Sequence, residues 1–158
     1  MLSRTVLRAA GFLALTVLAA CAGAPQVTRS LPIAGITEPV NLGALSRQFI
    51  AQTPYTVNFA FDIDALDARA RADLDIQAAW ILAHPAVRFS VYGHTDMVGS
   101  DAYNQELGMR RAQTVVAYLT GKGINPERLD AQISYGEAQP IIQTELRERA
   151  NRRATTYV

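Results

Sequence analysis

The sequence predicts an α+β fold, a two-layer sandwich in the order β-α-β-α-β-β with the helices packed on one face of a small mixed sheet. Two stretches carry apolar residues at helical spacing, and four short stretches around them are rich in β-branched and aromatic residues. The size agrees with this, because 158 residues of which 49% are apolar suffice for one core but hardly for two.

The first strand is expected at Tyr55–Phe61, where aromatic or β-branched residues alternate with small polar ones. Asp67 can cap a helix that runs to about Ala83, because its carboxylate can accept from the free amides of the first turn. A second strand follows at Val87–Tyr92 and ends at Gly93.

The second long helix begins at Ser100 or Asp101 and ends at about Thr120, before a glycine. Its apolar stripe consists of Ala112, Val115, Val116 and Leu119. The third and fourth strands are expected at Ala131–Tyr135 and Arg153–Val158.

The charge balance and the cysteine content exclude several classes of function. The 15 Lys and Arg residues nearly balance the 14 Asp and Glu residues, so we expect no nucleic-acid partner. Cys21 is the only cysteine, which excludes a disulfide framework and a cysteine-rich zinc site. We therefore expect no metal site and no cofactor.

The N-terminal residues have the pattern of an export signal. Arg4 and Arg8 precede an uncharged, mainly apolar run of 12 residues, whereas a helix that spans a membrane needs roughly 20. The run ends in Leu18-Ala19-Ala20-Cys21, which resembles a bacterial lipobox, the motif in which the cysteine is acylated and the chain is cut just before it. The alternative is a buried free cysteine at the end of an ordinary signal or anchor helix.

The expected organisation is a signal peptide at residues 1–20, an acylated Cys21 with a flexible tether at residues 21–49, and a folded domain at residues 50–158. The tether is inferred from its density of proline and glycine, although a short helix is expected within Leu42–Gln52. Because Ala22 rather than Asp follows the cysteine, the lipid is expected in the outer membrane, with the folded domain facing the periplasm.

Several motifs of the folded part occur together and in one order. They are Gly93-His94-Thr95-Asp96, Gly99-Ser100, Tyr103-Asn104, Leu107, Arg110-Arg111-Ala112, Ser134-Tyr135-Gly136 and Asn151-Arg152-Arg153-Ala154. With these motifs, residues 50–158 resemble the OmpA-like peptidoglycan-binding domain. The run Leu107–Ala112, with Gly108 where most relatives have serine, and the lipobox resemble the branch of peptidoglycan-associated lipoproteins.

The resemblance implies that the domain binds diaminopimelate of the peptidoglycan stem peptide, with Asp96 on the ammonium and Arg111 on the carboxylate. It implies supporting roles for Thr95, Asn104, Leu107 and Arg152. For Asn151 and Arg152 two alternatives stay open, a contact with the ligand and a role that only fixes the loop. Helical geometry agrees, because Asn104 and Arg111 are seven residues apart and share one flank of their helix. Arg111 is therefore expected to reach a cleft at the border between helix and sheet, whereas Arg110 faces solvent. The alternatives are a surface ion pair for Arg111 and a turn-capping role for Asp96.

The resemblance also implies a role as a non-covalent tether between the outer membrane and the cell wall, with TolB as a possible partner and a part in division. One alternative is a cell-wall hydrolase with a metal or general-base site at His94 and Asp96, which point the same way in an extended segment. We do not expect this enzyme, because a zinc site lacks further ligands of obvious spacing. The remaining alternative is a periplasmic scaffold that binds proteins.

Overall fold

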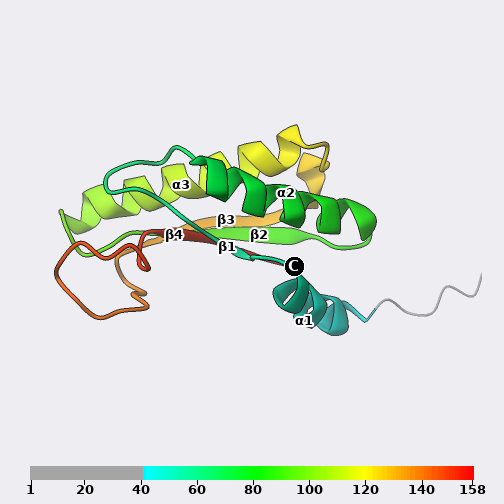
Figure 1. Cartoon of the computed structure of the whole chain (residues 1–158), viewed down its shortest axis with the longest axis horizontal. Coiled ribbons are helices and arrows are strands. Elements are labelled where there is room, and N and C mark those ends of the chain that lie inside the picture. The colour runs from blue at the N-terminus through cyan, green and yellow to red at the C-terminus, as the bar shows by residue number, and fades with distance from the viewer. Residues whose placement is uncertain (1–40) are drawn as a thin grey trace, which may run out of the picture. The chain divides into compact units, whose positions relative to one another are not determined.

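The computed structural model describes residues 41–158. Its elements are α1 (Leu42–Gln52), β1 (Thr56–Asn58), α2 (Ala68–Ala83), β2 (Phe89–His94), α3 (Asp101–Gly121), the 3-10 turn η1 (Pro126–Arg128), β3 (Leu129–Gly136) and β4 (Arg153–Tyr157). Helices α2 and α3 lie side by side on one face of the sheet (Figure 1). The predicted two-layer α+β fold is therefore confirmed, and the short helix expected within Leu42–Gln52 is present as α1.

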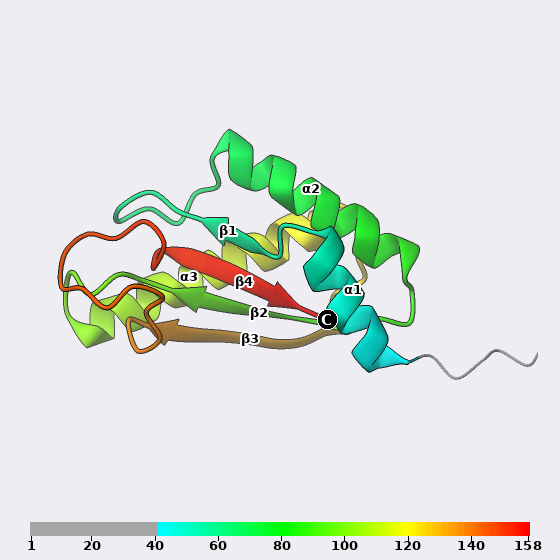
Figure 2. The same ribbon diagram turned by 60° about the horizontal axis from the view of Figure 1, so that its bottom comes forward.

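The sheet is mixed, with the strand order β1-β4-β2-β3. Strands β2 and β3 are parallel and are connected through α3, whereas β4 runs antiparallel to both of its neighbours, β1 and β2 (Figure 2). The last strand is thus central rather than peripheral. Thr155 and Thr156 are correspondingly only 5% and 1% exposed, although their side chains are polar.

The helix starts agree with the predicted caps. The Asp67 carboxylate accepts from the Ala70 amide at 2.7 Å, and the Ser100 hydroxyl accepts from the Tyr103 amide at 3.3 Å.

The first strand is shorter than predicted. It ends at Asn58, which pairs with Arg153, the first residue of β4, so the chain beyond it has no strand alongside. Residues 59–66 instead form a loop in which Asp62 has a φ of 58°. The prediction of a strand as far as Phe61 was wrong, because strand length depends on the neighbouring strand as well as on local sequence.

The folded domain begins at α1, earlier in the chain than the predicted start at residue 50. Phe49 is fully buried and its ring packs edge-on against Trp80 of α2, with 5.1 Å between the ring centroids. The boundary expected at residue 50 therefore falls inside a helix, and residues 42–49 belong to the folded domain rather than to a flexible tether. The expectations for residues 1–40, including Cys21, lie outside the described residues.

Helix α3 meets the sheet most closely at two glycines. A Cβ atom at Gly93 of β2 would lie 1.8 Å from the Gly108 carbonyl oxygen, and a Cβ atom at Gly108 would lie 2.3 Å from the Ser134 hydroxyl. The backbones of α3 and β2 are thus in direct contact, which side chains at these positions would prevent.

Gly93→Ala is expected to lower the free energy of unfolding by about 2 kcal/mol or more, because the helix must move away from a packed sheet. Gly121→Ala is the matched control, since a Cβ atom at Gly121 meets nothing within 4 Å. Gly121→Ala should change the free energy of unfolding by no more than about 0.5 kcal/mol. Urea denaturation of both variants measures the difference, and equal losses would show that the contact is not tight.

The sheet face opposite α2 and α3 carries a buried histidine, His94, which is only 4% exposed. Its Nδ1 atom has no hydrogen-bond partner within residues 41–158. Burial, and secondarily the positive charge of Arg153, lower the pKa of His94 from 6.5 to about 4. The folded domain therefore holds this imidazole neutral under conditions in which the unfolded chain would protonate it.

This difference makes stability depend on pH. The contribution of His94 is fully present above pH 6.5 and is lost as the pH falls towards the folded-state pKa of about 4. The loss amounts to at most about 3 kcal/mol. His94→Gln should remove this component, so the stability difference between wild type and variant should shrink from pH 7 to pH 4 in urea denaturation. A difference that is independent of pH would contradict the neutral imidazole.

Candidate ligand-binding site

The six residues predicted for the binding site meet at the end of the domain where β2 stops and α3 begins. Thr95 and Asp96 directly follow β2, Arg152 directly precedes β4, and the other three residues lie along α3. All six are buried: Thr95, Asp96, Asn104, Leu107, Arg111 and Arg152 are at most 9% exposed. The structure therefore brings together residues that are up to 57 positions apart in the chain.

Asp96 forms an ion pair with Arg152 rather than with Arg111. The distance between the Arg152 Nη1 atom and the Asp96 Oδ2 atom is 2.8 Å. The same oxygen accepts from the Glu148 backbone amide at 3.2 Å, and Arg152 Nε donates to the Phe59 carbonyl at 3.2 Å. Arg152, for which the sequence left a ligand contact and a loop contact equally open, thus connects Asp96 to the loop after β1.

Arg111 is fully buried and donates to three backbone carbonyls. Its Nε, Nη1 and Nη2 atoms donate to Ile63, His94 and Ala60 at 3.0, 2.9 and 3.2 Å, respectively. Its guanidinium also lies over the Phe59 ring, 5.2 Å from the ring centroid. The open cleft that we expected beside Arg111 is absent from the described residues, because the loop after β1 covers the side chain.

Burial is the main cause of a low pKa at Arg111, which falls from 12.5 to about 10. The negative charge of Asp96 partly opposes this shift, whereas the positive charge of Arg152 adds to it. The guanidinium therefore remains charged at neutral pH. Asp96, Arg111 and Arg152 form one electrostatic group of two cations and one anion.

The helical phase predicted for the two adjacent arginines is confirmed. Arg110 points away from the core, where its side chain is 40% exposed and pairs with Asp64 at 3.1 Å. Such a partly exposed pair contributes only about 0–1 kcal/mol. Arg110 and Arg111 thus have the same chemistry and opposite surroundings.

Two polar atoms in this cluster are buried without a hydrogen-bond partner among the described residues: Thr95 Oγ1 and Asn104 Oδ1. The Asn104 amide nitrogen donates to Glu137 in the loop after β3. Because buried polar groups are nearly always satisfied, such exceptions require an explanation, and a polar ligand is one.

The loop between β3 and β4 supplies contacts that the sequence analysis did not assign to the site. The Arg147 guanidinium lies 3.7 Å from the centroid of the Phe61 ring. Asn151 accepts from the Ile141 and Ile142 amides at 2.8 and 2.9 Å, so it fixes the loop, one of the two roles left open for it. No local signal identifies Arg147, because its partner Phe61 lies in a distant part of the chain.

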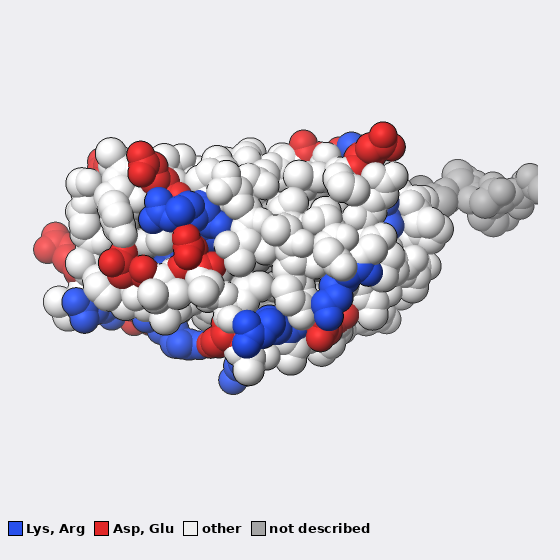
Figure 3. Space-filling view, turned by 90° about the horizontal axis from the view of Figure 1, so that it is seen from above, with Lys and Arg blue, Asp and Glu red and all other residues white. Residues whose placement is uncertain are grey.

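Charged side chains of both signs lie intermixed at the end of the domain where α3 begins, as the view onto the helices shows (Figure 3). Within residues 41–158 no group of three or more His, Cys, Asp or Glu residues could hold a metal ion. None of the helices described in that range is long and apolar enough to cross a membrane.

The chain is similar to proteins of the bacterial envelope. It is 39% identical over 100 residues to the peptidoglycan-associated lipoprotein of Haemophilus influenzae, a match that covers 63% of this chain and 65% of that protein. It is 34% identical over 146 residues to the peptidoglycan-associated lipoprotein of Rhizobium meliloti, with 87% and 80% covered. It is 35% identical over 111 residues to outer membrane porin F of Pseudomonas fluorescens, covering 69% of this chain but only 34% of the porin.

A solved structure, that of the peptidoglycan-associated lipoprotein from Burkholderia pseudomallei, matches the fold. The TM-score is 0.60 at 28% sequence identity, covering 65% of this chain and 88% of that one. The OmpA family model matches residues 58–154, which is more than half of the 158 residues and includes all six predicted site residues. The chain therefore belongs to the OmpA family.

Proposed function

We propose that this protein binds peptidoglycan non-covalently, through the diaminopimelate of the stem peptide, and so tethers the outer membrane to the cell wall. The OmpA family consists of structural peptidoglycan-binding proteins, not of enzymes. The observation that carries the proposal is the buried group of Asp96, Arg111 and Arg152, which lies at the end of the domain and combines an anion with guanidinium groups.

The free end of diaminopimelate carries an ammonium and a carboxylate on one carbon, so its binding site needs an anion and a cation in close proximity. Asp96 is the anion for the ammonium. Its Oδ2 atom accepts two hydrogen bonds, whereas its Oδ1 atom accepts none from the described residues. Arg111 is the cation for the carboxylate, because three of its five N–H groups are occupied and its planar group suits a bidentate pair.

Access to Arg111 requires a movement of the loop after β1. Two of the three carbonyls that bind the guanidinium belong to Ala60 and Ile63 of this loop. A ligand carboxylate that replaces one or both carbonyls keeps the guanidinium satisfied, so the exchange costs less than exposing an unpaired charge. The ion pair between Arg152 and Asp96 can likewise be replaced by one between Asp96 and the ligand ammonium, while Arg152 keeps its hydrogen bond to the Phe59 carbonyl.

The adjacent arginines provide a matched test of this site. Arg111→Lys should weaken binding of a diaminopimelate-containing stem peptide about tenfold, because a lysine ammonium cannot form the bidentate pair. Arg110→Lys makes the same chemical change at a solvent-facing position and should leave the affinity within about twofold. Isothermal titration of the purified protein measures both. Asp96→Asn should cost at least as much as Arg111→Lys, since the ammonium loses its anion.

A matched ligand checks the assignment without a change in the protein. A stem peptide with lysine in place of diaminopimelate keeps the ammonium but lacks the adjoining carboxylate. Wild type should bind it about as weakly as the Arg111→Lys variant binds the diaminopimelate peptide, and Arg111→Lys should discriminate little between the two peptides. Equal losses at positions 110 and 111 would contradict a specific bidentate pair at Arg111, because both substitutions keep the positive charge. Thermal unfolding establishes that every variant is folded.

The anchor of the tether is Cys21, which lies outside the described residues. Acyl chains on this cysteine would hold the protein in the outer membrane, since each buried CH₂ contributes about 0.8 kcal/mol. Two of the similar proteins are named lipoproteins, which supports this assignment.

Cys21→Ser should abolish acylation, because the lipobox acts through its thiol, and should leave the protein soluble in the periplasm or as an uncleaved precursor. Fractionation of membranes and mass spectrometry of the mature N-terminus measure this. Unchanged membrane association together with an N-terminus free of lipid would contradict the lipoprotein assignment.

A protein partner such as TolB, and a role in division, are part of the same proposal. The segment between β3 and β4 exposes large apolar side chains, with Ile141 at 61% and Leu146 at 74%. Exposed apolar residues next to the binding site suit a protein partner that competes with the cell wall.

A further inference from the structure

Four tyrosines and His94 form a continuous row of aromatic rings on the sheet face opposite α2 and α3. The ring centroids of successive pairs are 6.2 Å (Tyr55 and Tyr157), 5.6 Å (Tyr157 and Tyr92), 5.6 Å (Tyr92 and Tyr135) and 5.5 Å (Tyr135 and His94) apart. Tyr157 is 46% exposed. Hereafter this set of five rings is called the aromatic row.

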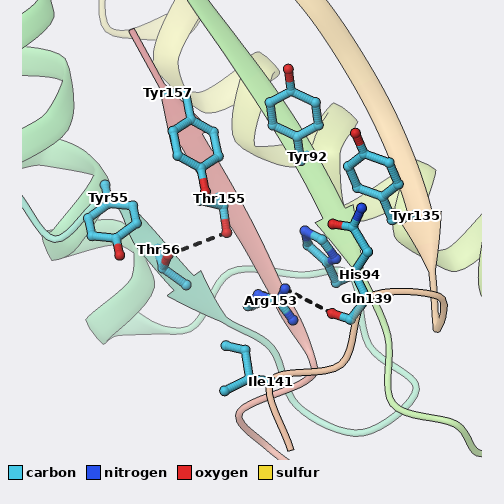
Figure 4. Close-up of a pocket in the computed structure, with 10 residues that line it drawn as sticks. All are labelled: Tyr55, Thr56, Tyr92, His94, Tyr135, Gln139, Ile141, Arg153, Thr155 and Tyr157. Atoms are coloured by element: carbon cyan, nitrogen blue, oxygen red, sulfur yellow. Dashed lines mark hydrogen bonds between the residues drawn. The ribbon is translucent and has the colours of Figure 1, made fainter. Parts of the chain in front are cut away.

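The aromatic row borders a pocket of about 410 Å³. This volume is within the range typical of small-molecule sites, roughly 300–1,000 Å³. Polar side chains from three segments complete the wall: Thr56, Gln139, Arg153 and Thr155. Figure 4 shows the tyrosine rings on one side of this pocket and Arg153 with Gln139 near its base.

Arg153 gives the pocket a positive charge that no carboxylate balances. Its side chain donates to the backbone carbonyls of Gln139 at 3.0 Å and Asn151 at 3.4 Å, and it has no carboxylate within 4.0 Å among the described residues. It is only 8% exposed, and no acidic side chain lines the pocket. A buried guanidinium without a counter-ion favours an anionic ligand group.

His94 is a second buried polar side chain of this pocket. It is 4% exposed, it lines the pocket, and its Nδ1 atom has no hydrogen-bond partner in the described part of the chain. A neutral imidazole can donate to or accept from a ligand hydroxyl or amide.

We propose that this pocket binds the glycan strand of the cell wall, through a sugar ring stacked on the aromatic row and a sugar carboxylate paired with Arg153. Flat aromatic rings with polar hydroxyl edges match the C–H faces and hydroxyl groups of a pyranose. The acidic amino sugar of peptidoglycan carries the anionic group that Arg153 needs only where an amidase has removed the stem peptide, because the peptide is otherwise attached through this carboxyl group. The proposed ligand of the pocket is therefore peptide-free glycan. The inference rests on the proposed function, because it assigns the polysaccharide part of the same polymer to a second site.

The two sites use different side chains and differ in their charge. The pocket shares none of its lining residues with the six residues of the stem-peptide site. It also lacks the anion that would hold an ammonium. The experiment below distinguishes a glycan on the aromatic row from two other occupants, a protein segment and a second copy of this chain.

The test is a titration of the purified full-length protein in detergent with glycan strands from which an amidase has removed the stem peptides. Wild type should bind these strands, and Tyr157→Ala should weaken binding about fivefold through the loss of one stacking ring. Tyr103→Ala is the matched control, because Tyr103 is 42% exposed against 46% for Tyr157 but lies on α3. Asp96→Asn should leave glycan binding unchanged.

The carboxylate assignment has its own ligand control. Chitin oligosaccharides have the same β-linked N-acetyl sugars without the carboxylate, and wild type should bind them about tenfold more weakly than peptide-free wall glycan. Arg153→Gln should abolish this preference. If that variant does not fold, the comparison of the two glycans on wild type still decides the point, since equal affinities would overturn the role of Arg153.

The outcomes separate this inference from the proposed function. Binding of the stem peptide without binding of peptide-free glycan overturns the inference and leaves the proposed function intact, whereas the reverse result overturns only the stem-peptide site. Equal losses for Tyr157→Ala and Tyr103→Ala would place any glycan contact elsewhere and overturn the inference. A further outcome would also overturn the inference: the wild type fails to bind glycan, and sedimentation shows a self-association that Tyr157→Ala abolishes.

Discussion

The position of every functional side chain on α3 depends on the direct backbone contact between Gly108 of this helix and Gly93 of β2. The Cβ atom that any other residue would carry at position 93 would overlap the Gly108 carbonyl at 1.8 Å, so the helix lies as near to the strand as the backbone allows. One helical turn on either side of Gly108 lie Asn104 and Arg111. The contact therefore sets how deeply these two side chains enter the domain.

Close packing of α3 explains why Arg111 is buried instead of lying in an open cleft. A guanidinium that enters the interior loses its hydration, and this loss is the largest cause of its lowered pKa. Carbonyls of His94 at the end of β2 and of Ala60 and Ile63 in the loop after β1 replace the lost water. One side chain thus connects three segments of the chain, and any ligand at Arg111 must compete with these interactions.

The fold could be predicted from the sequence, and the six residues proposed for the site lie together in the structure, whereas the interactions among them could not be predicted. Periodicity locates α2 and α3, and the caps at Asp67 and Ser100 fix their starts, because these signals are local. Helical phase likewise predicts that Arg110 faces solvent and that Arg111 does not. The ion pair between Asp96 and Arg152 joins residues 56 positions apart and depends on the course of two loops, which no periodic pattern encodes.

The end of the first strand and the role of α1 were mispredicted for the same reason. The chain after Asn58 has strand-like composition but no neighbouring strand, because β4 begins at its partner Arg153. Helix α1 follows a segment rich in proline and glycine, so its composition suggests a tether. Phe49 nevertheless packs on Trp80, and this long-range contact makes α1 part of the domain. In both cases tertiary contacts override local preference.

Strand β2 contributes to both proposed sites through the alternation of its side chains. Gly93 faces α3 and admits the helix that carries Arg111, whereas Tyr92 and His94 face the opposite side and belong to the aromatic row. The carbonyl of His94 accepts from Arg111 while its imidazole lines the pocket. A single residue therefore contacts both sites, its backbone serving one and its side chain the other. Because β2 is held between β4 and β3, the two proposed sites keep a fixed separation.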